Sequence, residues 1–163
     1  MNQSELNQLV IDLRDKGLTL AFAESCTAGM LASEFVKAKG SNDVLLGSIV
    51  VYQPEAKKKL LGVKQETLDL YTAESQQVTN EMVMGLKKSL NAKINVATTG
   101  LAGEGGSETP EKPVGTMFVS ILYDGKAEEF REVFTGNSES LRKQVTEYVY
   151  QKLRGVLDQH YSR

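Results

Sequence analysis

The sequence has 163 residues, of which 40% are hydrophobic and 25% are charged, with only 3 Pro and 14 Gly. This composition excludes a disordered or fibrous chain, and the length predicts a single domain over residues 1–163. No run approaches the roughly 20 apolar residues of a membrane-spanning helix, so no membrane association is expected. Nineteen basic and 21 acidic side chains leave a net charge of −2. Because no overall positive field attracts nucleic acid or anionic lipid, we expect a small molecule as partner.

Cysteine content and the start of the chain bear on the cellular compartment. The single cysteine cannot form an internal disulfide, and the first residues lack the basic and then apolar layout of a signal peptide. We therefore expect a soluble protein of the reducing cytoplasm.

The first half of the chain alternates helical and strand patterns. Apolar residues recur at helical spacing over residues 6–13 and predict a helix that ends near residue 16. Residues 18–23 predict a buried strand, followed by a helix up to residue 40 that Ser25 or Thr27 caps. Residues 44–52 predict a second buried strand, and the proline at position 54 begins a short helix through residue 61.

The second half predicts a helix, three strands and a terminal helix. Residues 75–90 have helical spacing with Thr72 or Ser75 as the cap, and residues 94–99 read as a strand. Residues 100–113 are too rich in Gly and Pro for regular structure. Residues 114–123 and 129–134 enclose an Asp-Gly pair, which is typical of an antiparallel hairpin. The final helix is capped by Asn137 or Ser138.

This order of elements predicts an α/β fold, a three-layer α/β/α sandwich with a mixed, mostly parallel sheet of about five strands. Ligands in such open sheets bind beyond the carboxyl ends of the strands. Three loops should therefore meet at a candidate site, and they are residues 24–27, 52–57 and 100–113.

Ser25 and Lys57 are the strongest candidates for chemistry. Ser25 falls where a strand ends and a helix begins, so its hydroxyl should face the crevice with the N–H groups that follow. A simple helix cap is the more common role of a lone serine there. The helix N-terminus and the adjacent Lys58 and Lys59 should lower the pKa of Lys57, and a neutral amine can take a proton from a serine. The alternative for Lys57 is a solvated basic face.

Other polar groups are weaker candidates. Cys26 is a rival nucleophile or a small buried side chain, and the sole histidine, His160, lies in the polar tail. One Cys and one His are too few ligands for a zinc site. Binding of a hard cation by carboxylates stays an open alternative. The glycines after Gly100 allow close approach to a phosphate, but they match no P-loop or dinucleotide motif and are otherwise a flexible connection. Arg142 offers a positive charge for an anion, or is solvated.

Three blocks of sequence together resemble one family. Residues 23–29 read Ala-Glu-Ser-Cys-Thr-Ala-Gly, and residues 52–57 read Tyr-Gln-Pro-Glu-Ala-Lys. Residues 99–103 read Thr-Gly-Leu-Ala-Gly, and residues 109–116 read Thr-Pro-Glu-Lys-Pro-Val-Gly-Thr. In combination, and over nearly the whole chain, they resemble the CinA C-terminal domain family, the nicotinamide-nucleotide amidohydrolases.

That resemblance implies deamidation of nicotinamide mononucleotide to nicotinate mononucleotide and ammonia, within NAD salvage and without a metal or cofactor. It also implies a three-layer fold and a homodimer. By position, Ser25 would be the nucleophile and Lys57 the base, with Tyr52 supporting the pair. The substrate-side positions that it implies are Cys26, Thr27, Thr99, Gly100, Gly103, Gly105 and Arg142.

The chain departs from the family's usual residues at Ala28, Glu74 and Glu104, where Gly, Val and Pro are common. These departures leave two alternatives open, a catalytically silent nucleotide-binding module of the same fold and an amidase for another carboxamide. The sequence shows no basic stripe and no stacked aromatics, so no nucleic-acid binding is expected.

Overall fold

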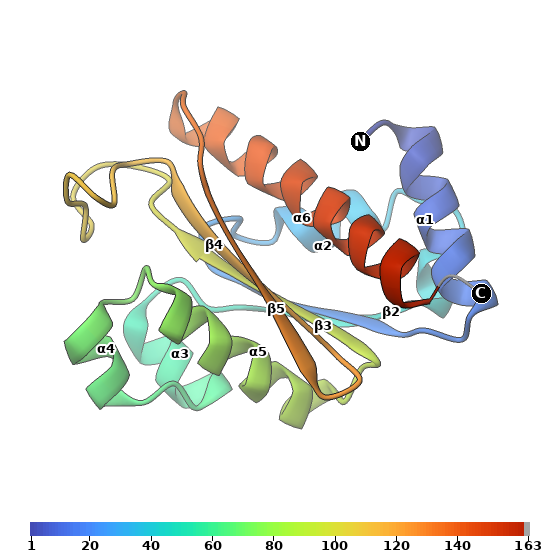
Figure 1. Ribbon diagram of the computed structural model, residues 1–163, viewed down its shortest axis with the longest axis horizontal. Coiled ribbons are helices and arrows are strands. Elements are labelled where there is room, and N and C mark those ends of the chain that lie inside the picture. The colour runs from blue at the N-terminus through green and yellow to red at the C-terminus, as the bar shows by residue number, and fades with distance from the viewer. Residues whose placement is uncertain (162–163) are drawn as a thin grey trace.

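Residues 1–161 of the computed structural model are described, and they contain a mixed sheet of five strands in the order β2-β1-β3-β4-β5 (Figure 1). Strand β1 pairs in parallel with β2 and with the central strand β3, whereas β4 runs antiparallel to both β3 and β5. This arrangement confirms the predicted α/β class and the hairpin at one edge. The strands are β1 (Leu20–Glu24), β2 (Leu45–Val50), β3 (Ile94–Gly100), β4 (Thr116–Tyr123) and β5 (Lys126–Val133).

Helices cover both faces of the sheet and make the outer layers of the sandwich. One face packs against α1 (Gln3–Asp15), α2 (Met30–Phe35) and α6 (Ser138–His160). The other packs against α3 (Pro54–Leu61), α4 (Gln65–Tyr71) and α5 (Gln76–Leu90). Side chains of β1 alternate between the two cores, with Phe22 facing the first and Ala21 and Ala23 the second. A short 3-10 helix, η1 (Ser41–Asp43), precedes β2.

Local chemistry explains where several elements begin. The side chains of Ser75 and Asn137 accept hydrogen bonds from the first turns of α5 and α6, as N-caps do. Asp124 and Gly125 have φ angles of 47° and 73°, which confirms the predicted type I′ turn between β4 and β5.

Gly85 in α5 lies so close to α3 that a Cβ atom there would fall 1.9 Å from the Leu61 carbonyl oxygen. A glycine is therefore required at this contact.

Three expectations about the elements are wrong. Helix α2 begins at Met30 and ends at Phe35, and its N-cap is Gly29, so neither Ser25 nor Thr27 caps it. Strand β2 is an edge strand with exposed Leu46 and Val50, because no neighbour covers its outer side. Helix α4 was not predicted, since it buries no residue and so carries no clear apolar stripe.

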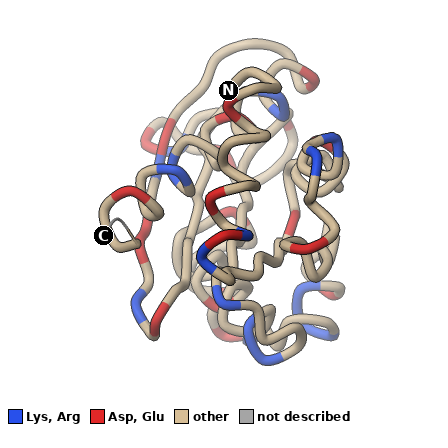
Figure 2. The backbone as a smooth tube through the Cα atoms, turned by 90° about the vertical axis from the view of Figure 1, so that its right-hand side faces the viewer, with Lys and Arg blue, Asp and Glu red and all other residues tan. Residues whose placement is uncertain are grey.

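The surface charge is mixed. Figure 2 shows Lys and Arg interspersed with Asp and Glu along the tube. Among the helices of residues 1–161, none combines the length and the apolar character needed to cross a membrane.

Candidate active site

A pocket of about 340 Å³ opens at the carboxyl ends of β1, β2 and β3, within the size range of small-molecule sites. The three predicted loops do meet there: the pocket is lined by Ser25 and Cys26, by Tyr52 to Pro54, and by the glycine segment from Gly100 to Gly106. Two further elements close it. Glu74 comes from the connection between α4 and α5, and Ser138 and Arg142 come from the start of α6.

The structure brings Ser25 and Lys57 together at this pocket. The Lys57 Nζ atom lies 2.8 Å from the Ser25 Oγ atom, within hydrogen-bond distance. Lys57 is only 1% exposed and Ser25 6% exposed. Pro54 at the first position of α3 sets the direction of that helix, whose first turn carries Lys57 inward.

Burial shifts the protonation equilibrium of Lys57 toward its neutral form. Burial lowers the pKa of Lys57, while the charges of Glu74 and Cys26 act to raise it. The Nζ atom also lies 3.0 Å from the Val51 carbonyl oxygen and 3.4 Å from that of Tyr52. A neutral amine has two N–H groups and one lone pair. When the two carbonyls accept the N–H groups, the lone pair is left for the Ser25 hydroxyl.

The cause of this lowered pKa differs from the expectation. Desolvation is the largest contribution, and no influence of neighbouring lysines on Lys57 is resolved. Lys58 instead forms an ion pair with Glu55, with 3.1 Å between Nζ and Oε2. The three consecutive lysines therefore differ in kind, because only Lys57 points into the protein.

Glu24 builds the turn that presents Ser25. Its carboxylate is fully buried and accepts five hydrogen bonds of 2.7–3.0 Å. The donors are the hydroxyls of Thr27 and Ser48 and the backbone N–H groups of Gly29, Leu31 and Ala32. Sequence analysis assigned no role to Glu24, although a carboxylate at the end of a buried strand and before a helix is a signal for one.

The turn also leaves two backbone donors next to Ser25. The Ser25 N–H donates to the Thr98 carbonyl at 3.1 Å, which ties the turn to β3. Within residues 1–161, the N–H groups of Cys26 and Thr27 donate to no carbonyl or side-chain oxygen. Of these two residues only Cys26 lines the pocket, so its N–H group is available to a ligand's oxygen. Ala28 follows with a φ of 50° and is exposed, so its methyl group does not line the pocket.

Cys26 is a buried side chain and a poor nucleophile. Its Sγ atom lies 3.8 Å from the Thr98 Oγ1 atom, and burial raises the pKa of its thiol to about 11. His160 lies far from it in sequence and contacts Glu128, with 3.0 Å between Nε2 and Oε1. In the described part of the chain, no three His, Cys, Asp or Glu side chains group as a metal site would require.

The other predicted site residues differ in what they contribute. Gly100, Gly103 and Gly105 line the pocket, and a Cβ on Gly100 would collide with Met117 and the Thr116 carbonyl. Arg142 lines it too, and its Nε donates to the Cys26 carbonyl at 3.2 Å.

Tyr52 lines the pocket, whereas Thr27 and Thr99 are buried. The Tyr52 side chain is 58% exposed, and its contact with Lys57 is made by the backbone carbonyl rather than the phenol. The Thr27 hydroxyl is used by Glu24, and the buried Thr99 hydroxyl donates to the Ala73 carbonyl at 3.4 Å. Neither threonine lines the pocket.

Lys112 holds the glycine loop against the connection between α4 and α5, and sequence analysis gave it no role. Its Nζ donates to the hydroxyls of Thr72 and Ser107, each at 2.8 Å, and to the Glu74 carbonyl at 3.0 Å. Ser107 in turn donates to the Glu74 carboxylate at 2.6 Å. These bonds join the loop of residues 101–115 to the residues before α5.

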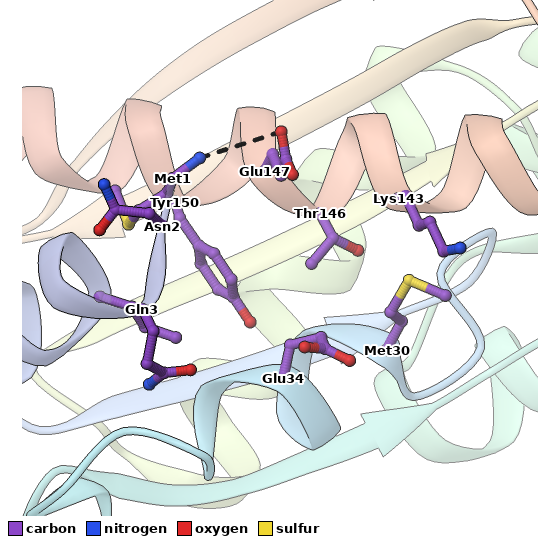
Figure 3. A pocket seen from close by; sticks show the side chains of 10 residues that line it. Met1, Asn2, Gln3, Met30, Glu34, Lys143, Thr146, Glu147 and Tyr150 are labelled. Carbon is purple, nitrogen blue, oxygen red and sulfur yellow. Dashed lines mark ion pairs between the residues drawn. The ribbon is translucent and has the colours of Figure 1, made fainter.

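A second hollow of about 260 Å³ lies between α1, α2 and α6 (Figure 3). Tyr150 is the largest polar side chain in it, and its hydroxyl donates to the Leu31 carbonyl at 2.6 Å. Burial raises the pKa of Tyr150, so the phenol stays protonated. Among the residues that line this hollow, no nucleophilic side chain is hydrogen-bonded to a side chain that could act as its base. The pocket at Ser25 is therefore the better candidate.

Known proteins resemble the chain closely in sequence and fold. A "CinA-like protein" of Thermotoga neapolitana is 42% identical over 155 residues, and the match covers 94% of this chain but 38% of that protein. The chain therefore spans about two fifths of such relatives. The crystal structure of the competence damage-inducible protein A (ComA) from Klebsiella pneumoniae has a TM-score of 0.92 and 30% identity, with 98% of this chain and 99% of that chain covered. The competence/damage inducible protein CihA from Agrobacterium tumefaciens has a TM-score of 0.88 and 30% identity, with 93% of each covered.

The family itself follows from a match over almost the whole sequence. The CinA C-terminal domain model matches residues 2–157, a range that includes Ser25, Lys57 and the glycine loop. The chain therefore belongs to the CinA C-terminal domain family.

Proposed function

We propose that this chain is a serine–lysine amidohydrolase that converts nicotinamide mononucleotide and water to nicotinate mononucleotide and ammonia. The observation that carries the proposal is the 2.8 Å contact between the buried Lys57 amine and the Ser25 hydroxyl at the mouth of a small-molecule pocket. The family resemblance supplies the substrate, and the geometry supports the reaction type.

In the first half of the reaction, Ser25 Oγ attacks the carboxamide carbon while its proton passes to the Lys57 lone pair. The carbonyl oxygen becomes an oxyanion, for which the N–H group of Cys26 is an available donor. In other acyl-transfer enzymes one such donor contributes about 3–4 kcal/mol. The protonated Lys57 then gives its proton to the departing nitrogen, the C–N bond breaks, and ammonia leaves an acyl-Ser25 ester.

In the second half, water attacks the acyl carbon and gives a proton to Lys57. The carbon–oxygen bond to Ser25 breaks, and Lys57 returns the proton to the Ser25 Oγ. The product is a carboxylic acid that ionises to nicotinate mononucleotide. Arg142 and the backbone of the glycine loop are the groups available to the phosphate, since both line the pocket.

The experiment is an ammonia-release assay on the purified chain with nicotinamide mononucleotide, with chromatographic detection of the acid product. Ser25→Ala and Lys57→Met should each lower turnover by roughly a thousandfold, because each removes one partner of the proton transfer. Ser33→Ala and Lys59→Met are matched controls, since both side chains are exposed and neither lines the pocket. Unchanged turnover in Ser25→Ala would exclude the nucleophile.

The same assay separates the alternatives. Binding of the nucleotide without product would identify a silent binding module, and ammonia release from a different amide would identify another amidase. A homodimer, a cytoplasmic location and the absence of nucleic-acid binding stay predictions.

A further inference from the structure

Glu74 is a carboxylate at the wall of the reactive pocket, and its charge interacts with two lysines, Lys57 and Lys112, without a direct salt bridge to either. It is half-buried and lines the same pocket as Ser25. Among residues 1–161 it forms no ion pair, and its one side-chain hydrogen bond comes from the neutral Ser107 hydroxyl at 2.6 Å. Its charge is nevertheless felt at the reaction centre, because it acts on Lys57. A ligand in this pocket therefore meets a carboxylate that no cationic side chain contacts directly among residues 1–161.

The contacts of its neighbours hold Glu74 in place. Lys112 donates to the Glu74 backbone carbonyl and to Ser107, but forms no ion pair with the carboxylate. Lys112 also binds the Thr72 hydroxyl at 2.8 Å, and Thr72 has a φ of 66° and a ψ of 165°. A β-branched residue rarely adopts this strained backbone region and persists there only where contacts enforce it. The hydrogen bonds of Lys112 and Ser107 thus fix the conformation of the connection that carries Glu74.

The charges that line the pocket come from opposite layers of the fold. Arg142 is on α6, which covers one face of the sheet, whereas Glu74 precedes α5 on the other face (Figure 1). Ser25 belongs to the turn after β1, a strand of the sheet that lies between these layers. The third charged residue, Glu104, is on the glycine loop and is exposed, so water screens it. This arrangement suits a ligand with separate negative and positive groups.

We propose that Glu74 is a specificity-determining residue, which favours a carboxamide on a positively charged pyridinium ring over the same carboxamide on a neutral ring. The inference rests on the proposed function and deepens it. A ring attached directly to the carbon that Ser25 attacks must lie within a few ångströms of that hydroxyl, in the pocket that Glu74 also lines. A positive ring there also offsets the negative field that Glu74 exerts on Lys57.

The test compares two probes that differ in ring charge. Nicotinamide mononucleotide carries a pyridinium ring, and its reduced form carries a neutral dihydropyridine with the same carboxamide, ribose and phosphate. Binding is measured by titration calorimetry in a Ser25→Ala background, so that no turnover is involved. Glu74→Gln keeps an acceptor for Ser107 and removes only the charge. It should weaken binding of the oxidised nucleotide about tenfold, as Coulomb's law gives for unit charges several ångströms apart in a half-solvated site. Binding of the reduced nucleotide should change less than about twofold.

Glu104→Gln is the matched control, because it removes the same charge from an exposed position of the same pocket. It should weaken binding of either probe by less than about threefold. Equal losses for both probes in Glu74→Gln, or no loss for the oxidised one, would overturn the inference. The proposed function fails separately, through the absence of ammonia release by the unmodified chain. A tenfold, charge-selective loss would support the role of Glu74 even then.

Discussion

Replacing Glu24 by glutamine tests whether a buried carboxylate builds the nucleophile's turn. One carboxylate oxygen of Glu24 accepts from the Thr27 hydroxyl and from the N–H groups of Gly29 and Leu31, and the other accepts from Ala32 and Ser48. The glutamine oxygen can keep the first set of three. Its NH₂ group then faces the Ala32 N–H, which is a donor without an acceptor, while the Ser48 hydroxyl can rotate to accept.

The expected cost follows from this geometry. One charge-assisted hydrogen bond is lost and one buried N–H is left unpaired, which together cost about 3 kcal/mol. For a chain of 163 residues, this loss corresponds to a fall in Tm of about 9 °C. The turn that carries Ser25 should also loosen, so kcat should fall while the fold persists.

Thermal and urea unfolding of Glu24→Gln measure this cost, and Ser48→Ala is the reference variant. Ser48→Ala removes one hydroxyl donor and should cost about 1 kcal/mol. If Glu24→Gln lost no more stability than Ser48→Ala, the bonds to the Gly29, Leu31 and Ala32 N–H groups would contribute little, and the reasoning would be refuted.

The remaining predictions concern the base and two backbone positions. Lys57→Met should be at least as stable as the unmodified chain at neutral pH, since it removes the desolvation cost of a buried amine, the same cost that lowers the pKa of Lys57. Because the unfolded chain holds the Lys57 proton up to a higher pH than the folded chain does, the free energy of unfolding of the unmodified chain, relative to that of Lys57→Met, should rise with pH between the folded pKa of Lys57 and 10.5. Urea unfolding at a series of pH values measures this difference, and a fall with pH would contradict the prediction. The activity should likewise increase with pH as Lys57 loses its proton, and Glu74→Gln should move this rise to lower pH, as a pH–rate profile would record. Gly85→Ala should lose about 2–3 kcal/mol, because a Cβ there meets the Leu61 carbonyl at 1.9 Å; an unchanged Tm would mean that α3 and α5 have room to separate. Ala28→Gly should raise the free energy of unfolding by about 0.5–1 kcal/mol, because glycine adopts the left-handed backbone at φ 50° without strain. A lower free energy of unfolding in this variant would disprove the strain at Ala28.

The order of layers and the meeting of the three loops were predictable because they depend on local patterns. Apolar spacing, the Asp-Gly turn and the proline at position 54 act within a few residues. The carboxyl ends of parallel strands then bring Ser25 and the glycine loop to one edge. The pairing of Ser25 with Lys57 was predicted from the family resemblance as well as from position, and its distance agrees with it.

The parts that sequence analysis missed depend on contacts between distant residues. Lys112 bonds Thr72, 40 positions away, and neither residue carries a local pattern that announces the other. The pKa of Lys57 was expected to fall because of nearby charge, but burial is the dominant cause, and burial is known only once α3 is packed. The sequence of β2 is mostly apolar and therefore predicts a buried strand. In the structure β2 is an edge strand, and Leu46 and Val50 are exposed.

The two walls of the pocket, the turn of Ser25 and the glycine loop, differ in rigidity. Five bonds to one interior carboxylate lock the turn of Ser25, whereas the glycine loop opposite it is mostly exposed and is tied down chiefly through Lys112. Hydrogen exchange should accordingly be slow at Leu31 and Ala32 and fast along residues 103–106. Under the proposed function, attack on the amide depends on the turn of Ser25 and the choice of amide on the glycine loop. A redesigned loop should then change the preferred amide while leaving Ser25 and Lys57 undisturbed.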